Sequence, residues 1–573
     1  MTNLYCGNVT KKYIGKIVSI NGWVKKIRKM GPITFLDIAD RYGLIQIVTK
    51  QEINITRESV VNVVGKVVAR KAINNKLKNG DVEIDANQIN ILSLAQTTPI
   101  IVEDITDGLE DIRLKYRYLD LRRNILRDKI ILRSKFIHAL RQYLQDNDFI
   151  EVETPTLTKP TPEGARDYIV PTRNGPNQFF ALPQSPQIFK QLLMVAGFNR
   201  YFQVAKCWRD EDLRADRQPE FTQLDMELSF INEKQVMQII ENMLRFAIKK
   251  ILNIDIITPF KIMNYDECID KYGCDKPDLR YDLKLTNLNN IFAHSDFCIF
   301  KNILDQKGFI KGFAIDNILI NKNDFNKIEK FATDKGSKIY YITYDKNKKV
   351  SGTLSKAIDI KLVEDAFNYF GYKQGSLIIC ADINLQIVNE SLGAARIACN
   401  NIYKFAKEDQ LEFTWVINWP LFEYDKQLNK WAAAHHPFTS PSLECINNFD
   451  IDKKNAKARA YDIVLNGYEI GGGSIRITNY ELQNRMFNAI GLSQKEITNK
   501  FGYLLEAFKY GVPPHGGVAL GLDRLLMILT KSETIKDVIA FPKNTRGNDL
   551  MLDAPSSSND LNLDELFLKI VKK

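Results

Sequence analysis

The stretch that most constrains the fold of this chain runs from Phe202 to Ser229 and reads FQVAKCWRDEDLRADRQPEFTQLDMELS. Side chains alternate between the two faces of a strand, and the alternation here predicts two strands joined by a charged loop. One face of the first strand carries Gln203, Ala205, Cys207, Arg209 and Glu211. One face of the second carries Phe221, Gln223, Asp225 and Glu227. Paired antiparallel, the strands would form a polar floor, although an ordinary solvent-facing sheet alternates in the same way.

Length and composition indicate a multidomain globular protein. The chain has 573 residues, 45% of them apolar and 26% charged, so we expect about three or four domains. The eight cysteines include no CxxC pair, and we find neither a long apolar run nor a signal core. We therefore expect reduced thiols, a cytoplasmic location and no membrane segment. A net charge of +10 suits an RNA partner, but a lysine-rich composition alone gives the same charge.

Residues 1–97 read as an all-β domain with a break at Gly31-Pro32. The candidate strands are Ile17–Lys25, Thr34–Asp37, Leu44–Val48, Val63–Arg70 and Val82–Leu92. Five short strands suit an OB barrel, which often reads single-stranded nucleic acid. A ring, two cations and three amide or carboxylate groups are candidates for RNA contact: Phe35, Arg28, Arg70, Gln46, Asn74 and Glu83. A small barrel without a ligand would show the same strand pattern.

The middle of the chain offers organisation rather than chemistry. A linker at 98–125 contains the basic run Arg113–Arg123, which alone would be a solvated charged helix. A helix from Ser134 and a strand at Phe149–Val152 follow. The helix has the apolar stripe Phe136, Ile137, Leu140, Tyr143 and Leu144. Residues 280–400 alternate helix and strand patterns, for example at Lys338–Thr343 and Ser376–Ala381.

A candidate helix at Pro183–Gly197 could present polar groups to a ligand. Ser185 suits the N-cap, Pro186 the first helical position and Gly197 the exit. The spacing predicts a buried face made of Phe189, Leu192, Leu193 and Ala196. Gln187 and Lys190 then share another face near the positive end of the helix dipole, which suits an anionic ligand. A solvated lysine is the alternative.

The stretch AYDIVLNGYEIGGGSIRI (460–477) predicts a β-hairpin with a two-residue Asn466-Gly467 turn. Pairing outward from the turn sets Asp462 opposite Gly471 and places Asp462 and Glu469 on one face. Two ionised carboxylates this close repel, and a Mg²⁺ ion that bridges phosphate oxygens would relieve the repulsion. The three glycines would let a ligand approach the backbone. Arg476 adds a planar fork able to grip a carboxylate.

The stretch GGVALGLDRLLMIL (516–529) predicts a strand, a turn and a helix that begins near Asp523. Arg524 falls in the first helical turn, where a cation opposes the helix dipole. A locally unfavourable position often marks function. His435 and His436 could suggest a metal site, but adjacent side chains point apart and no cysteine or carboxylate spacing completes a ligand set.

Together these motifs resemble the class II aminoacyl-tRNA synthetases. WRDEDLRADRQPEFTQLDME resembles motif 2 in the form found in bacterial-type aspartyl-tRNA synthetases, and GGVALGLDRLLMIL resembles motif 3. The helix, the strand and Thr154-Pro155 resemble motif 1, which implies a homodimer. GWVKKIRKMGPITFLDIADRYGLIQIV resembles the anticodon-binding OB domain of that family. IKGFAIDN resembles, more loosely, the inserted GAD domain of the bacterial enzymes.

The resemblance implies roles for particular residues. The catalytic arginines would be Arg209 and Arg524. Aspartate would be bound by Glu163, Gln187, Lys190, Arg209, Asp225, His435 and Arg476. ATP would be bound by Arg209, Asp210, Glu211, Gln218, Phe221, Glu469, Gly521, Leu522, Asp523 and Arg524. Mg²⁺ would be held by Asp462 and Glu469. The RNA candidates of residues 1–97 would meet the anticodon loop.

The implied reaction joins L-aspartate to tRNA(Asp) in two steps. The aspartate carboxylate would attack the α-phosphorus of ATP and displace pyrophosphate, with no general base because the nucleophile is already ionised. The 3′-hydroxyl of the terminal adenosine would then attack the adenylate. Lys190 and Arg476 would clamp the substrate side chain, and an asparagine substrate would leave a buried charge unpaired.

Three alternatives stay open. A non-discriminating enzyme would also charge tRNA(Asn); Met30 stands where such members often have histidine, which favours the narrow type. A small-molecule asparagine synthetase of this fold would have no reason to keep an OB domain. A silent RNA-binding paralogue would have lost Arg209, Arg476 or Arg524.

We therefore expect a multidomain α+β fold. Its parts would be an OB barrel (1–97), a linker (98–125), a catalytic domain in two segments (126–279 and 401–573) and an inserted α+β domain (280–400).

Overall fold

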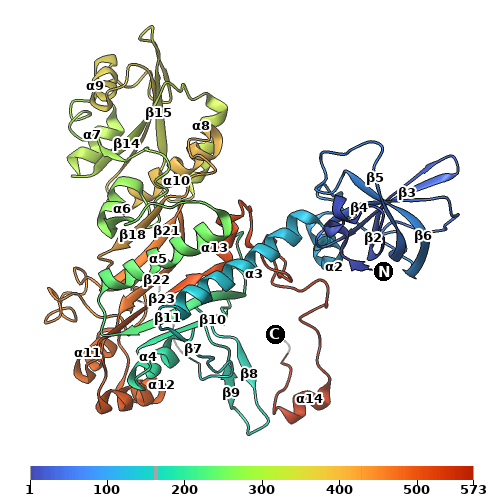
Figure 1. Cartoon of the computed structure of the whole chain (residues 1–573). Helices are drawn as coiled ribbons and strands as arrows, with labels where there is room; N and C mark the ends of the chain where they lie inside the picture. The colour runs from blue at the N-terminus through green and yellow to red at the C-terminus, as the bar shows by residue number, and fades with distance from the viewer. Residues whose placement is uncertain (1, 161–164, 427–428, 572–573) are drawn as a thin grey trace. The chain divides into compact units, whose positions relative to one another are not determined.

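The computed structural model describes residues 2–160, 165–426 and 429–571 (Figure 1). The chain divides into two compact units, Met1–Ile131 with Ala540–Ser556, and Leu132–Ile539 with Ser557–Lys573. Within the described ranges, no helix is long and apolar enough to cross a membrane.

The first unit contains a closed barrel, and the predicted OB architecture is confirmed. Its strands are β1 (Thr2–Leu4), β2 (Ile17–Met30), β3 (Ile33–Asp40), β4 (Gly43–Thr49), β5 (Val60–Ala69) and β6 (Val82–Ser93). The sheet order is β1-β2-β3-β4-β6-β5, and a β2–β5 pairing closes it. Alternating apolar residues such as Val18, Ile20, Ile45 and Ile47 fill the interior. The short parallel strand β1 had no sequence signal.

The basic run of the linker is not a solvated helix. It forms two short helices, α1 (Glu110–Lys115) and α2 (Arg117–Asp120). Asp120 is fully buried and accepts hydrogen bonds from Arg117 Nη1 at 2.9 Å and Arg123 Nη1 at 2.6 Å. Arg117 and Arg123 also donate to backbone carbonyls, including those of Glu103 and Ala540. Arg117, Asp120 and Arg123 therefore form a buried, hydrogen-bonded cluster, whereas Lys115 of the same run stays exposed.

The second unit is organised around an eight-stranded sheet in the order β12-β18-β21-β22-β23-β11-β10-β7. In that order the strands are Lys261–Asn264, Phe413–Ile417, Ala460–Leu465, Tyr468–Ile475, His515–Gly521, Glu220–Ser229, Arg200–Trp208 and Ile150–Glu151. The pairs at the two ends, β12–β18 and β10–β7, are parallel, and the central pairs are antiparallel.

Three helices cover one face of this sheet (Figure 1). They are α3 (Asn124–Gln145), α5 (Glu233–Leu252) and α13 (Leu522–Leu529). α3 begins at Asn124, earlier than the predicted Ser134, and its predicted stripe is confirmed because Phe136, Leu140 and Leu144 are fully buried. Leu224, Met226 and Leu228 of β11 meet these helices in the core, so the polar side chains of β11 are left for the opposite face.

Residues 286–382 form a separate five-stranded antiparallel sheet in the order β13-β14-β17-β15-β16. These strands are Thr286–Asn287, Phe309–Asp316, Gly375–Asp382, Ile339–Tyr344 and Val350–Gly352. α8 (Lys322–Thr333) and α10 (Leu385–Tyr403) pack on one face, and α7 (Cys298–Asp305) and α9 (Ile360–Phe370) on the other. The alternating helix and strand pattern is confirmed as an α+β arrangement.

Shorter elements complete the second unit. The helices are α4 (Gln187–Val195), α6 (Tyr265–Tyr272), α11 (Tyr480–Ala489), α12 (Gln494–Ala507) and α14 (Asp560–Glu565). Two small hairpins pair β8 (Ile169–Pro171) with β9 (Phe179–Ala181), and β19 (Phe422–Asp425) with β20 (Lys430–Ala433).

Candidate active site

The predicted pair of floor strands is present, with one correction: β10 ends at Trp208, so Arg209 and Glu211 lie in the loop that follows and not on the strand. β10 and β11 pair antiparallel, with Gln203 opposite Asp225, Ala205 opposite Gln223 and Cys207 opposite Phe221. β23 continues the floor, because Asp225 faces Ala519 and Glu227 faces Gly517. Gly517 is required there: a Cβ at this position would lie 1.9 Å from Glu227 Oε2.

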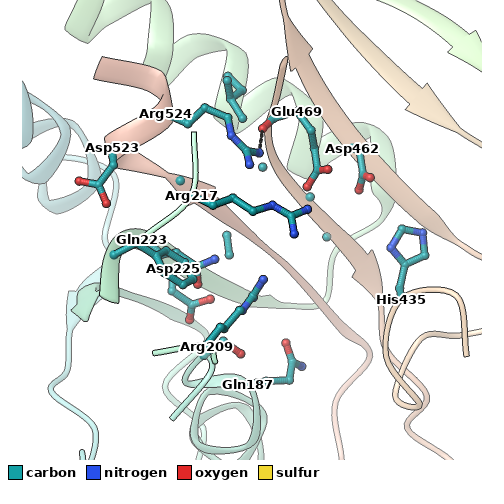
Figure 2. A pocket seen from close by; sticks show the side chains of 18 of the residues that line it. Gln187, Arg209, Arg217, Gln223, Asp225, His435, Asp462, Glu469, Asp523 and Arg524 are labelled. Carbon is teal, nitrogen blue, oxygen red and sulfur yellow. Dashed lines mark hydrogen bonds between the residues drawn. The ribbon is translucent and has the colours of Figure 1, made fainter. Parts of the chain in front are cut away.

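A cavity of about 400 Å³ lies over this floor. Figure 2 shows side chains from the loop after β10, from β11, α4, the β21–β22 hairpin and α13 converging on it. The predicted residues that line the cavity are Gln187, Lys190, Arg209, Glu211, Gln218, Phe221, Asp225, His435, Asp462, Glu469, Arg476, Gly521, Asp523 and Arg524. Segments far apart in the sequence thus bring most of the predicted site residues to one place.

The face that α4 buries differs from the prediction. Gln187, Lys190, Gln191 and Met194 are buried, whereas Phe189, Leu192 and Leu193 are half-buried and Ala196 is exposed. The predicted apolar stripe was therefore wrong, because the carboxylates of β11 attract the polar face of the helix. The helix starts at Gln187 with Pro186 at the N-cap, one position later than predicted. Gly197 follows with φ +84°, as an exit glycine should.

Lys190 and Arg476 belong to a buried network of four charges. Lys190 Nζ lies 2.6 Å from Asp225 Oδ1 and 3.3 Å from Glu227 Oε2. Arg476 grips Glu227 by two bonds, from Nε at 2.8 Å and Nη2 at 3.1 Å. Two cations and two carboxylates that are at most 3% exposed therefore balance one another at the floor of the cavity.

The two carboxylates differ in their protonation. Burial raises the pKa of Asp225 to about 6, although Lys190 works against this shift. Burial also acts to raise the pKa of Glu227, but Arg476 and Lys190 outweigh it and lower the pKa to about 2. Asp225 is thus the carboxylate that changes charge near neutral pH.

Several buried polar atoms around the cavity have no hydrogen-bond partner within the described part of the chain. They are Gln187 Nε2, Arg209 Nε, Asp225 Oδ2, His435 Nε2 and Arg524 Nε. A buried unsatisfied group is costly, so a set of them facing one cavity indicates a polar ligand. The set contains donors and an acceptor, as a zwitterionic or phosphorylated ligand requires.

The two adjacent histidines play different parts. His435 packs edge-on against Trp419 with ring centroids 5.0 Å apart, and burial lowers its pKa to about 4. His436 Nε2 contacts Arg476 Nη1, which can only donate, so this nitrogen carries the lone pair. Burial, followed by the charge of Arg476, lowers the pKa of His436 as well. Both rings are therefore neutral near pH 7.

The hairpin that carries Asp462 and Glu469 forms as predicted, with one correction. Asn466 and Gly467 have φ of +53° and +84°, which fits the two-residue turn. A bulge between Ile463 and Val464 shifts the register, so Asp462 lies opposite Gly472 and not Gly471. A Cβ on Gly472 would lie 2.2 Å from Asp462 Oδ1, so the carboxylate needs a glycine opposite it.

Asp462 and Glu469 fit a divalent cation that also binds phosphates. Burial and the charge of Glu469 raise the pKa of Asp462 well above its usual range. A cation would relieve this repulsion. The described residues contain no group of three or more metal-ligating side chains. A protein site of one or two carboxylates is what Mg²⁺ uses when phosphates supply the other ligands.

Two arginines lie on opposite sides of the cavity (Figure 2). The Arg209 guanidinium lies over the Phe221 ring, 5.1 Å from its centroid. Arg524, in the first turn of α13, donates to the Glu469 carbonyl and pairs with Asp216 Oδ2 at 3.0 Å. These contacts offset the unfavourable position of Arg524 at a helix N-terminus.

Some predicted residues lie elsewhere. Asp210 is not among the cavity-lining residues and lies 3.6 Å from Arg166 Nε. The Leu522 side chain is fully buried in the core, which leaves only its backbone to a ligand. Asp523 reaches the cavity edge, but its carboxylate accepts from Arg133 and from the Thr222 amide. Glu163 lies outside the described residues.

Other cavity-lining residues were not predicted. They include Ser185, Asp216, Arg217, Gln223 and His436. Gln223 shares the strand face of Asp225 and Phe221, as the alternation predicted, but it was not among the predicted site residues. Asp216 and Arg217 lie in the loop between two strands, where no periodicity orders the side chains. Arg217 Nη1 pairs with Glu211 Oε2 at 3.2 Å.

The first unit has its own polar cluster, centred on Gln46. Gln46 Oε1 accepts from Arg28 at 3.0 Å and Arg70 at 2.6 Å, and its Nε2 donates to Glu83 at 2.6 Å. Phe35 lies opposite Arg28 in the β2–β3 pairing. Asn74 is set apart in the following loop, where its side chain accepts from the Lys76 amide. Asp37, which was not predicted, pairs with Arg28 at 2.9 Å.

Comparison with known families agrees with this arrangement. Residues 109–545 match the model of tRNA synthetases class II (D, K and N), and residues 18–92 match that of the OB-fold nucleic acid binding domain.

Full-length relatives agree as well. The chain is 51% identical to an aspartate--tRNA ligase of Ureaplasma parvum and 48% identical to one of Malacoplasma penetrans, over 99% of each chain. It is 44% identical to an aspartate--tRNA(Asp/Asn) ligase of Caldanaerobacter subterraneus, over 99% of this chain and 98% of the relative.

A solved asparaginyl-tRNA synthetase from Pyrococcus horikoshii shares the fold, with a TM-score of 0.59 at 19% identity over 95% of this chain and 98% of that one. Family models, relatives and the site therefore converge: the chain belongs to the class II aminoacyl-tRNA synthetases, in the aspartate--tRNA ligase family.

Proposed function

We propose that this protein activates L-aspartate with ATP and transfers it to tRNA(Asp). The observation that carries the proposal is the network of Lys190, Asp225, Glu227 and Arg476 at the floor of the cavity. Two buried cations suit the side-chain carboxylate of aspartate, and the unpartnered Asp225 Oδ2 suits its ammonium. An asparagine side chain would lose the charge-assisted bonds, and a lysine side chain would be repelled.

The remaining cavity residues suit the activation step. Arg209 is positioned to neutralise charge that grows on the α-phosphate as the aspartate carboxylate attacks. Phe221 offers a ring for adenine, and Glu211 and Gln218 offer polar atoms beside it. Arg524 suits the distal phosphates. The neutral imidazole of His435 keeps an unpartnered Nε2 toward the substrate region. No general base is required, because the attacking carboxylate is already ionised.

Asp462 and Glu469 are the residues that would hold Mg²⁺, which would neutralise the phosphate oxygens when bound. The raised pKa of Asp462 supports this assignment, because the unneutralised pair is electrostatically unfavourable.

The barrel of the first unit suits the anticodon. Its cluster of Arg28, Gln46, Arg70 and Glu83 combines cations for phosphate with donors and acceptors for base edges, and Phe35 adds a stacking ring. Two relatives that are both 44% identical to the chain are named aspartate--tRNA ligase and aspartate--tRNA(Asp/Asn) ligase. We favour the narrow type because Met30, at the exposed end of β2, occupies the position where members of broad specificity often have histidine.

We also propose a homodimer and a reducing compartment. β7 is the edge strand of the eight-stranded sheet, and Ile150 on it is 48% exposed. A second subunit could cover this strand edge and its apolar surface. All eight cysteines are free thiols, which fits a cytoplasm. Light scattering of the purified protein would give twice the chain mass if the dimer forms.

The test of the main proposal is aminoacylation with labelled aspartate on purified tRNA(Asp) and tRNA(Asn). Charging of tRNA(Asp) alone supports the proposal in full. Comparable charging of both supports the enzyme and overturns its narrow specificity. Failure to charge either, with aspartate-dependent ATP turnover retained, would replace it with a small-molecule synthetase. Absence of both activities would favour a silent RNA-binding protein.

A further inference from the structure

Arg524 is held from two sides in the cavity. Its Nη2 lies 3.0 Å from Asp216 Oδ2, and its Nη1 donates to the Glu469 carbonyl. Its Nε is buried and has no partner among the described residues. In these contacts Glu469 supplies a backbone carbonyl and Asp216 a carboxylate, and Asp216 comes from the loop between β10 and β11.

The backbone of that loop is fixed beside Asp216. The Ala215 carbonyl accepts two hydrogen bonds, from Thr534 Oγ1 at 3.0 Å and from the Ile535 amide at 3.0 Å. Asp216 can therefore release Arg524 by rotation of its own side chain while the loop stays in place. The pair is only partly buried, with side-chain exposures of 23% for Arg524 and 26% for Asp216. Its net strength is consequently modest.

A phosphate group and Asp216 are alternative partners for the same guanidinium. Arginine binds phosphate best through two parallel N–H bonds, and here one of the outer nitrogens already serves a carboxylate. A carboxylate in the cavity also repels a triphosphate or pyrophosphate directly. Arg524 keeps a second anchor, the Glu469 carbonyl, so Asp216 is not needed to hold the guanidinium toward the cavity.

We propose that Asp216 sets the affinity of this site for the distal phosphates by competing with them for Arg524. The inference rests on the proposed function, in which Arg524 binds ATP and pyrophosphate. Asp216 weakens the binding of ATP by a modest factor. After aspartyl-adenylate forms, the same carboxylate takes Arg524 back and speeds the departure of pyrophosphate. Asp216 thus lowers the affinity for ATP and in return raises the rate at which pyrophosphate leaves.

The test uses the full-length protein and the variant Asp216→Asn, which removes the charge and keeps the size of the side chain. Equilibrium binding of MgATP and of magnesium pyrophosphate would be measured without aspartate. Both dissociation constants should fall, by about two- to fivefold for a partly exposed ion pair. Pyrophosphate should also become a stronger product inhibitor of aspartate activation by a similar factor. The KM for aspartate should stay the same.

The matched control is Glu533→Gln. Glu533 is an exposed acid beside Thr534 and lies outside the cavity lining, so the substitution removes one negative charge near the loop. It should leave both dissociation constants unchanged. Equal tightening in both variants would reduce the effect to general electrostatics and overturn the proposal. Unchanged or weaker binding in Asp216→Asn would overturn it too, and weaker binding would make Asp216 a positioning residue for Arg524.

These readouts separate the inference from the function on which it rests. Tighter binding in a damaged or unfolded variant is not expected, so a gain of affinity cannot come from loss of structure. If the wild-type protein binds MgATP but shows no aspartate-dependent exchange of pyrophosphate, the proposed function fails while the binding comparison still decides the role of Asp216.

Discussion

Lys190 and Asp225 form a buried ion pair, with Nζ 2.6 Å from Oδ1 and side-chain exposures of 2% and 0%. Such a pair contributes little to stability, because removing two charges from water is costly. Replacing it with apolar residues of similar volume often leaves the free energy of unfolding unchanged. Here the pair stands beside a second one, Arg476 with Glu227, under a cavity with unpartnered polar atoms. The ion pairs are better explained by recognition of a charged amino acid than by stability.

Replacing Lys190 with methionine should strongly weaken the binding of aspartate and leave the binding of ATP unchanged. We expect the KM for aspartate in pyrophosphate exchange to rise by at least about 30-fold, because a buried charge pair loses one partner. Lys249→Met is the control: Lys249 of α5 makes an exposed ion pair with Asp255, so this substitution should change neither the KM for aspartate nor the KM for ATP. Comparable losses for both substrates would argue that Lys190 supports the fold alone.

Aspartate activation should depend on pH through Asp225. Its carboxyl must be ionised to pair with Lys190 and the substrate ammonium, so kcat/KM for aspartate should fall as the pH drops below about 6. The stability of the fold should depend on pH in the opposite direction. Because the pKa of Asp225 is raised on folding, its carboxyl contributes fully to stability below its ordinary pKa of 3.8, and the contribution is lost as the pH rises through about 6. A rate profile at saturating ATP checks the first statement.

His435 is the control for that profile. Its pKa of about 4 keeps it neutral above pH 5, so His435→Gln should lower activity without moving the inflection near pH 6. An inflection that vanishes in this variant would assign the titration to His435 instead.

Replacing Asp462 with asparagine should raise the Mg²⁺ requirement and stabilise the fold. The half-saturating Mg²⁺ concentration should increase by about tenfold or more when one carboxylate ligand is lost. Thermal unfolding should shift upward, because the variant removes a buried carboxylate whose pKa is raised by burial and by Glu469. Glu444→Gln, at an exposed acid outside the cavity, should change neither quantity.

The same substitution should have opposite effects at two glycines. Gly517→Ala should destabilise the protein by about 1–3 kcal/mol or more, because its Cβ would lie 1.9 Å from Glu227 Oε2. Gly502→Ala, inside α12, places its Cβ 3.8 Å from the Thr498 methyl and should gain about 0.5–1 kcal/mol. Chemical denaturation of both variants measures the difference. Equal effects would contradict the packing of Glu227 over Gly517.

Replacing Gln46 should weaken the binding of tRNA and leave the activation of aspartate unchanged. Gln46→Ala removes the side chain that joins Arg28, Arg70 and Glu83, so the KM for tRNA should rise by about tenfold or more. Pyrophosphate exchange, which needs no tRNA, should be unchanged. Gln88→Ala, on the exposed part of β6, serves as the control.

Much of the fold could be predicted because its signals are local. Alternation along Phe202–Ser229 sufficed for the two floor strands and for the face that Gln223 and Asp225 share. Asn466-Gly467 sufficed for the hairpin turn, since both residues tolerate a positive φ. Five strands and a Gly-Pro break sufficed for the barrel. In each case the spacing of a few neighbouring residues fixes the geometry.

The rest depended on what each element meets in space. The periodicity of α4 gave an apolar stripe, yet the carboxylates of β11 buried its polar face instead. The bulge in the β21–β22 pairing shifted the register by one residue, so Asp462 lies opposite Gly472 and not Gly471. Arg117 and Arg123 of the basic run are buried because both pair with Asp120. Arg524 pairs with Asp216, which lies in a loop where no periodicity predicts the direction of a side chain.

The sequence by itself therefore determined the strands, the turns and, through its motifs, the family. Tertiary structure decided which charges face one another and which are buried. The physical reason is that periodicity specifies the face on which a side chain lies, whereas pairing and burial energies depend on residues that are distant in the chain and near only in the fold.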